Sequence, residues 1–379
     1  MIDIHILKRI YKGAGESMKY YQFNTGEESI SIPLKPDIKK MYVEVTTGCN
    51  YSCITCIRHS WIDEMGDMSM KVFNKLVEDM KALPDLKCVH FGGFGEPLTH
   101  PNILEMIKKC KEIGLSVEMI TNGSMLTPTV ANALVELGLD WIFVSLDGPD
   151  DDSFGTIRPG ASYEEVVQNI EYLQKLKRQK RTIKPELGIE FVATKTNIKK
   201  LPAMPRLTDR LGAHKFIVTN VLPYHESMKD EILYDTGLDL NSFGRESTFL
   251  SVKAAPNMQL RTARHCRFVE NKALAVTRDG NISPCYAFMH TYTCYIMGRK
   301  KDMIAHNFGN IMDRTIEAIW TDPAYARFRW MVRNSEYPSC TDCRMVEGCS
   351  TAFNNEADCW GNNPSCADCL WARDIVMCP

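Results

Sequence analysis

Between residues 40 and 222, short apolar runs alternate with longer segments whose apolar residues recur at helical spacing. Short runs bounded by turn residues predict strands, and a period near 3.6 residues predicts helices. Ser69 stands where an N-cap is expected, Thr127 precedes a proline that suits a first helical turn, and another helix is predicted over 163–180. The predicted strands are Met41–Thr46, Lys87–Phe91, Ser116–Thr121, Trp141–Leu146, Leu187–Ala193 and Phe216–Val221.

Six strand–helix units, each of about 30 residues, imply parallel strands joined by right-handed crossovers. A complete barrel of this kind has eight units, so six predict a partial, open (β/α)6 barrel and an α/β fold class. In such barrels, functional residues lie on the loops that follow the carboxyl ends of the strands. The motifs described below fall on those loops.

Fifteen cysteines are the unusual part of the composition. Three lie between residues 49 and 56, and ten lie between residues 266 and 378. The amino terminus is too short and too charged, at Lys8 and Arg9, for a signal peptide, and the cysteine count is odd. Clustered thiols in a chain of 379 residues without an export signal favour metal binding over disulfides, and we expect a cytoplasmic protein.

Charge and hydropathy argue against two other classes of partner. The chain has 45 Lys and Arg residues against 47 Asp and Glu residues, a net charge of −2. This balance does not favour nucleic acid or a membrane surface as the main partner. No apolar run approaches the roughly 18 residues that a membrane span needs.

The same patterns divide the chain into four parts. Residues 1–39 form an extension without a clear fold, and residues 40–222 form the barrel. Residues 223–260, which contain Pro223, Gly237, Gly244 and Pro256, form a connecting segment. Residues 261–379 form a cysteine-rich module.

The first predicted strand leads directly into a loop with three cysteines, Cys49, Cys53 and Cys56. Thiolates spaced in this way can surround one face of a cubane iron–sulfur cluster. With only three protein ligands, one iron remains open for a substrate, as in catalytic metal sites that keep a vacant position. The alternative, also compatible with the spacing, is a zinc or structural-cluster site that takes a distant fourth ligand.

This loop resembles the signature of the radical S-adenosylmethionine (SAM) superfamily, in which three and then two residues separate the cysteines. The resemblance implies a [4Fe–4S] cluster on Cys49, Cys53 and Cys56, whose open iron binds the amino and carboxylate groups of SAM. It also implies reductive cleavage of SAM to a 5′-deoxyadenosyl radical. One departure is Thr55, because the family usually has an aromatic residue before its last cysteine.

Four further loops resemble segments of the same family, although each alone could be an ordinary turn. The second strand ends in GFGEP, which resembles the family's GGEP motif with Phe94 inserted. The third strand ends in TNG, the fourth in SLDG and the sixth in TNVL, and an arginine follows the fourth. The resemblance implies SAM-binding roles for Gly93, Gly95, Glu96, Pro97, Thr121, Asn122, Ser145, Asp147, Arg158 and Val221. Cys88 and Cys110 are predicted to be small core residues.

The later cysteines resemble the SPASM extension of radical SAM enzymes, which carries up to two auxiliary [4Fe–4S] clusters. Cys266 is followed by thirteen residues and then by Gly280, and four more residues separate Gly280 from Cys285. The family has another cysteine at the position of Phe353, so Cys359 or Cys366 must replace it and the partition of ligands, including Cys294, stays open. The candidate auxiliary ligands are Cys266, Cys285, Cys340, Cys343, Cys349, Cys359, Cys366, Cys369 and Cys378. A zinc ribbon is the alternative for the CxxC pairs.

The final segment, from NPSCADCLWA to Cys378, resembles the radical SAM maturases of tungsten-containing aldehyde ferredoxin oxidoreductases. This resemblance implies that the partner is a tungsten oxidoreductase or its pterin cofactor, with a low-potential donor such as ferredoxin or flavodoxin. A peptide-modifying SPASM maturase is the first alternative. An iron–sulfur electron carrier or a zinc-binding protein is an alternative of another class. No catalytic acid or base is predicted.

Overall fold

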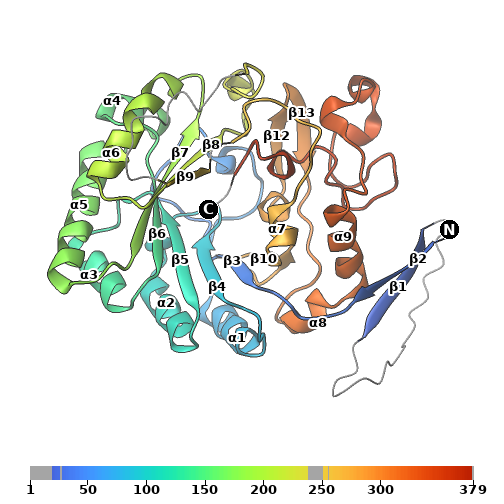
Figure 1. Cartoon of the computed structure of the whole chain (residues 1–379), viewed down its shortest axis with the longest axis horizontal. Coiled ribbons are helices and arrows are strands. Elements are labelled where there is room, and N and C mark those ends of the chain that lie inside the picture. The colour runs from blue at the N-terminus through green and yellow to red at the C-terminus, as the bar shows by residue number, and fades with distance from the viewer. Residues whose placement is uncertain (1–18, 26–27, 238–250, 255, 378–379) are drawn as a thin grey trace.

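A nine-stranded sheet forms the centre of the computed structural model, which describes residues 19–25, 28–237, 251–254 and 256–377 (Figure 1). The strand order is β11-β10-β3-β4-β5-β6-β7-β8-β9. Neighbours from β3 to β8 are all parallel, which confirms the predicted α/β partial barrel. These six strands are β3 Lys40–Glu44, β4 Cys88–Gly92, β5 Ser116–Thr121, β6 Trp141–Ser145, β7 Glu186–Ala193 and β8 Lys215–Asn220.

Helices between these strands cover the outer face of the sheet (Figure 1). The predicted caps are present, because Ser69 Oγ accepts the Val72 N–H at 3.2 Å and Thr127 Oγ1 accepts the Val130 N–H at 3.4 Å. The helices of the barrel are α1 Met70–Lys81, α2 Ile103–Glu112, α3 Pro128–Glu136, α4 Asp151–Ile157, α5 Tyr163–Lys180 and α6 Met204–Arg210.

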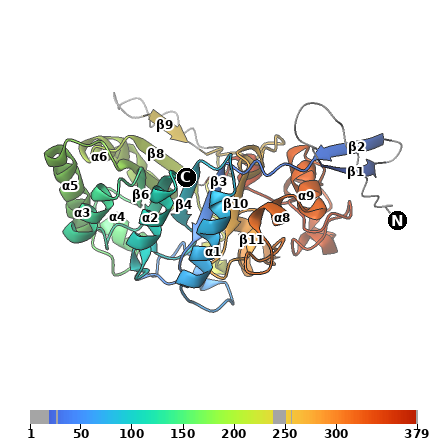
Figure 2. The same ribbon diagram turned by 90° about the horizontal axis from the view of Figure 1, so that it is seen from below.

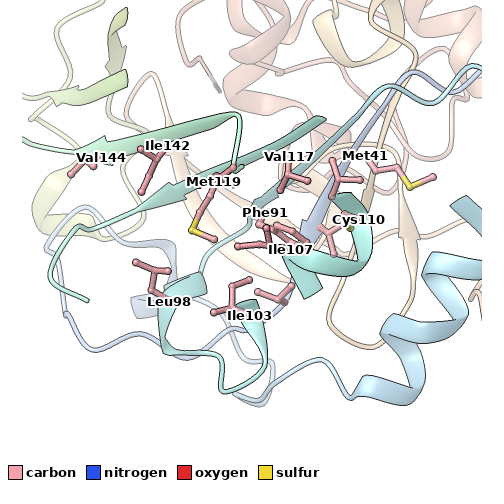
Figure 3. Packing of buried hydrophobic residues seen from close by; sticks show 14 of the residues in the cluster. Met41, Phe91, Leu98, Ile103, Ile107, Cys110, Val117, Met119, Ile142 and Val144 are labelled. Carbon is pink, nitrogen blue, oxygen red and sulfur yellow. The ribbon is translucent and has the colours of Figure 1, made fainter. Parts of the chain in front are cut away.

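Alternate residues of each strand face the helices and the inside of the barrel. On β4, Val89 and Phe91 are fully buried in the core beneath the helices, and Phe91 lies beside Ile107 and Cys110 of α2 (Figure 3). His90 points the other way and contacts inner rings, including Tyr42 at a centroid distance of 5.1 Å. Cys110 is therefore a core residue, as predicted, and burial raises the pKa of its thiol to about 12.

The cysteine-rich segment continues the same sheet. Strand β10, Ala273–Val276, pairs in parallel with β3, and β11, Ile282–Ser283, pairs antiparallel with β10. Among the described residues, this part also contains a hairpin, three α-helices and several short 3-10 turns, and it lies beside the barrel in Figures 1 and 2. The hairpin and the α-helices are β12 Tyr292–Ile296, β13 Arg299–Met303, α7 Arg267–Glu270, α8 Ile316–Trp320 and α9 Pro323–Arg333.

Three features differ from the sequence prediction. The extension of residues 1–39 contains an antiparallel hairpin, β1 Tyr20–Thr25 and β2 Glu28–Pro33, with the Phe23 ring 5.2 Å from that of Trp330 on α9. The connecting segment supplies β9, Ser251–Ala254, which pairs with β8. The first barrel strand ends at Glu44 because Thr46 turns away to form an isolated bridge with Asp67.

No helix in the described ranges is long and apolar enough to cross a membrane. The central sheet contains strands from both the barrel segment (40–222) and the cysteine-rich segment (261–379), because β10 pairs with β3. The boundaries of the four sequence segments therefore stay predictions.

Candidate functional site

The three-cysteine loop begins where β3 ends. Thr46 Oγ1 accepts the Gly48 N–H at 2.9 Å and donates to Asp67 at 2.6 Å, which fixes the start of the loop. Burial raises the pKa of the Cys49 and Cys53 thiols above the ordinary value, and for Cys53 the nearby Arg158 charge opposes this rise. Partly buried thiols of this kind suit an iron cluster, whose positive charge stabilises thiolates.

Protein groups donate hydrogen bonds to two of these sulfurs. Arg58 Nε lies 3.3 Å from Cys56 Sγ, and the Tyr51 N–H lies 3.4 Å from Cys49 Sγ. Arg58 also donates to the Tyr51 carbonyl at 2.5 Å, so it spans the loop. Sequence reasoning missed Arg58, for which the only signal is a basic residue two positions after the last cysteine. Donors to cluster sulfurs adjust the reduction potential of a cluster.

The GFGEP loop packs its backbone directly on the cysteine loop. A Cβ on Gly95 would lie 2.2 Å from the Thr46 carbonyl oxygen and 2.6 Å from that of Gly48, so only glycine fits. The next residue, Glu96, donates its N–H to the Gly48 carbonyl at 2.8 Å. Pro97 begins a short 3-10 turn, Pro97–Thr99.

Glu96 connects the second and third motifs. Its carboxylate accepts from the Leu98 N–H at 3.0 Å, the Thr121 hydroxyl at 2.7 Å and the Asn122 N–H at 2.6 Å. Burial raises the pKa of Glu96, although these hydrogen bonds oppose the rise. Asn122 Nδ2 in turn lies 2.9 Å from Asn50 Oδ1 and 3.8 Å from Cys49 Sγ. Both carboxylate oxygens of Glu96 therefore already position other site residues.

Asp147 and Arg158 form a buried ion pair beside the cysteine loop. Asp147 Oδ2 accepts from Arg158 Nε and Nη2, each at 2.8 Å, and Asp147 Oδ1 accepts the Val192 N–H at 2.8 Å. Burial lowers the pKa of Arg158, but the charges of Asp147 and Cys53 outweigh it and raise the pKa overall. The Ile54 N–H donates to the Ile157 carbonyl at 3.0 Å, which holds the cysteine loop next to this arginine.

Ser145 is the last residue of β6, and Val221 is the first residue after β8. Ser145 is the Cα partner of Glu190 on β7, and the Val221 N–H donates to the Ala193 carbonyl at 3.1 Å. Sequence reasoning missed Glu190, which lies inside an otherwise apolar run. It is buried on the inner face, and burial together with the Asp147 charge raises the pKa of Glu190 to about 7.

Five of the later cysteines line one cavity of about 300 Å³ between the barrel and the auxiliary part, and four of them form a candidate ligand set: Cys266, Cys285, Cys366 and Cys369. Burial raises the pKa of Cys366 well above its ordinary value, and Cys369, Cys285 and Cys266 add to the rise in that order. Buried cysteines whose thiolates would repel one another fit the positively charged core of a cluster with four cysteine ligands. Cys294 is the fifth cysteine of the cavity. Burial raises the pKa of its thiol to about 12, and the largest charge effect on that pKa comes from Lys301, not from another cysteine.

The remaining candidate ligands in the described residues are Cys340, Cys343, Cys349 and Cys359, and the charge of Cys359 acts on the Cys340 thiol. Successive turns bring the first three together, because the Cys343 N–H donates to the Cys340 carbonyl at 3.3 Å and the Cys349 N–H donates to the Val346 carbonyl at 3.2 Å. Cys343 and Cys359 are exposed. Cys378 lies outside the described residues. Within the described ranges, no three His, Cys, Asp or Glu side chains converge closely enough to hold a single metal ion, but a cubane is larger than one ion.

Comparisons with known proteins match this arrangement. The family model for the radical SAM superfamily matches residues 43–183, and the SPASM model, an iron-sulfur cluster-binding domain, matches residues 266–344. A protein of Pyrococcus furiosus named "Tungsten-containing aldehyde ferredoxin oxidoreductase cofactor-modifying protein" is 38% identical over 351 residues, 90% of this chain and 97% of the relative.

Two solved structures have the same fold. Streptococcus suis SuiB bound to S-adenosylmethionine matches with a TM-score of 0.59 and 15% identity, covering 84% of this chain and 73% of the other. Native anSMEcpe with bound AdoMet matches with a TM-score of 0.55 and 15% identity, covering 89% of this chain and 94% of the other. These two matches concern the fold, whereas the family models and the relative of high coverage lead to the conclusion that this chain belongs to the radical SAM superfamily and is a SAM-dependent iron–sulfur enzyme with a SPASM domain.

Proposed function

We propose that this enzyme takes part in the maturation of a tungsten-containing aldehyde ferredoxin oxidoreductase, by modifying its cofactor or the protein that carries it. The observation that supports this function is the 38% identity to the Pyrococcus furiosus cofactor-modifying protein over 97% of that relative. Such coverage includes both the barrel and the auxiliary part, so the similarity is not confined to the motifs that all radical SAM enzymes share.

In this proposal, Cys49, Cys53 and Cys56 hold a [4Fe–4S] cluster with one open iron. With SAM bound, that group supplies a 5′-deoxyadenosyl radical by reductive cleavage. The chain positions the reactants: Glu96 fixes Asn122 beside Cys49, and Arg58 donates to Cys56. The proposed SAM-contacting residues remain Gly93, Gly95, Glu96, Pro97, Thr121, Asn122, Ser145, Asp147, Arg158 and Val221.

Two auxiliary clusters complete the proposed cofactor content. Cys266, Cys285, Cys366 and Cys369 would hold the first, since they share a cavity. Cys340, Cys343, Cys349 and Cys359 would hold the second, with Cys378 as a further candidate ligand. We infer a cytoplasmic enzyme that receives electrons from ferredoxin or flavodoxin, because open cubanes need a reducing compartment and a low-potential donor.

Anaerobic co-expression with the tungsten oxidoreductase tests the proposal. The wild-type enzyme should yield an active oxidoreductase and convert SAM to 5′-deoxyadenosine and methionine. The triple variant Cys49→Ala, Cys53→Ala, Cys56→Ala should lose both activities, whereas the matched control Cys88→Ala, on β4, should keep them. An oxidoreductase that is fully active without this enzyme would contradict the maturation role, and peptide substrates would then become the better hypothesis.

A further inference from the structure

Three charged side chains from separate parts of the chain meet beside the GFGEP loop. Glu44 ends β3, Asp63 follows the cysteine loop, and His290 belongs to the auxiliary part. His290 Nε2 lies 3.0 and 2.9 Å from the two Glu44 carboxylate oxygens, and His290 Nδ1 lies 2.6 Å from Asp63 Oδ2. Ionised carboxylates only accept hydrogen bonds, so when Glu44 and Asp63 are both ionised, both ring nitrogens donate, which is the protonated form of the imidazole.

This cluster is shielded from water on its inner side. Glu44 is fully buried and His290 is 4% exposed, whereas the Asp63 side chain is 37% exposed. The rings of Trp61 and Phe94 pack edge-on against the imidazole, at centroid distances of 4.3 and 5.8 Å. Burial lowers the pKa of His290, but the hydrogen bonds and charges of Glu44 and Asp63 outweigh it and raise the pKa overall.

Glu44 also contacts the GFGEP loop. Its Oε1 accepts the Phe94 N–H at 3.3 Å. A Cβ on Gly93 would lie 2.7 Å from Glu44 Cγ, and Gly93 has a φ of +99°, so the loop lies against this side chain in a conformation that glycine favours. The position of the Gly93–Phe94 backbone therefore depends on where Glu44 is held.

We propose that His290 is a positioning residue for SAM binding: as an imidazolium it holds Glu44 against the Gly93–Phe94 loop and thereby couples the auxiliary domain to the SAM site. The inference rests on the proposed SAM-binding role of that loop. Without the imidazolium, Glu44 would be a buried carboxylate without its counter-charge, and it would be driven to move or to take up a proton. Either change withdraws the support of the loop.

The consequence is a link between pH and SAM affinity. Among the described residues, the charged groups bonded to the imidazole are Glu44 from the barrel and Asp63 from the segment after the cysteine loop, and the uncharged rings of Trp61 and Phe94 pack against it. As the pH rises through the pKa of His290, the imidazolium loses its proton and affinity should fall. The variant His290→Gln should bind SAM weakly both below and above the pKa of His290, because glutamine carries no charge at either pH.

The test is equilibrium dialysis of SAM against anaerobically reconstituted enzyme over a pH series, with thermal unfolding recorded in parallel. His290→Gln should raise the Kd for SAM by at least about tenfold at neutral pH, the scale at which supporting partners act on binding sites. The double variant Glu44→Gln, His290→Gln should restore most of the affinity, since two neutral amides can pair. The control His306→Gln, an auxiliary-domain histidine packed on Phe308, should match the wild type.

Distinct results separate the possible failures. If His290→Gln lowers thermal stability but leaves the Kd and its pH dependence unchanged, His290 is only a structural contact and the proposal is wrong. If His290→Gln does not fold, the double variant and the wild-type pH series still decide the question. If the wild type itself neither binds nor cleaves SAM, the proposed function fails rather than this inference.

Discussion

Asp147 binds Arg158 through a single carboxylate oxygen, because Oδ2 accepts both guanidinium donors while Oδ1 is occupied by the Val192 N–H. Each of these two predicted SAM-binding residues is thus the main partner of the other. Any contact that they make with SAM is made by a preformed, desolvated pair, and the geometry of one cannot change without the other.

The pair predicts a specific pattern of stability. Arg158→Met leaves Asp147 charged and buried, so the free energy of unfolding should fall by about 3–5 kcal/mol. Adding Asp147→Asn should recover a large part of that loss, since the uncompensated charge is then gone. Urea unfolding of the two variants and the wild type measures both values. Losses that simply add in the double variant would contradict the coupling.

Glu190 predicts a pH dependence of stability. Its pKa is raised to about 7 in the folded chain, so between about pH 4.5 and 7 the folded state holds a proton that the unfolded state has released. Stability should therefore fall as the pH rises through this window. Glu190→Gln removes this loss. The free energy of unfolding of the variant, relative to that of the wild type, should therefore increase by on the order of 2–3 kcal/mol as the pH rises from about 5 to about 8. Unfolding curves whose difference is constant with pH would refute the assignment.

Metal analysis tests the two groups of auxiliary cysteines. The reconstituted enzyme should contain about 12 iron atoms per chain, three cubanes of four irons each. The variant Cys266→Ala, Cys369→Ala should lower this to about 8, whereas Cys294→Ser should leave it unchanged. About four irons with stoichiometric zinc would favour the zinc-ribbon alternative instead.

Arg58 predicts a change in redox behaviour. Because it donates to Cys56 Sγ at 3.3 Å, Arg58→Gln should destabilise the reduced cluster and lower its midpoint potential by tens of millivolts, roughly. A redox titration followed by electron paramagnetic resonance measures the shift. Arg314→Gln, which breaks an auxiliary-domain pair with Asp322, is the matched control. Equal potentials in all three proteins would exclude the proposed role.

The sequence predicted the barrel well because local patterns determine it. The helix predicted over 163–180 is present as α5, Tyr163–Lys180, and the six parallel strands differ from their predicted bounds by at most two residues at an end. Their apolar runs and caps are local signals. The hairpin of β1 and β2 lies outside the alternating strand–helix pattern, and it packs on α9, far away in the sequence, so its place in the fold is not a local signal.

The site was less predictable where side chains from distant segments meet. Motif order identified the cysteine loop, and the structure links Glu96, Thr121 and Asn122 as neighbours. The contact of Glu44 with His290 joins residues 246 positions apart, and no local pattern indicates it. The grouping of Cys366 with Cys266 likewise requires the tertiary fold, which spacing along the chain cannot supply.

Strand β10 has a practical consequence for anyone who divides this chain. It pairs with the strand that leads into the cysteine loop, with Val276 opposite Val43. A fragment that ends near residue 222 would leave β3 with a free edge, and such edges promote aggregation. The auxiliary part cannot be removed cleanly as a module. Comparisons of cluster content are therefore better made with cysteine substitutions than with truncated proteins.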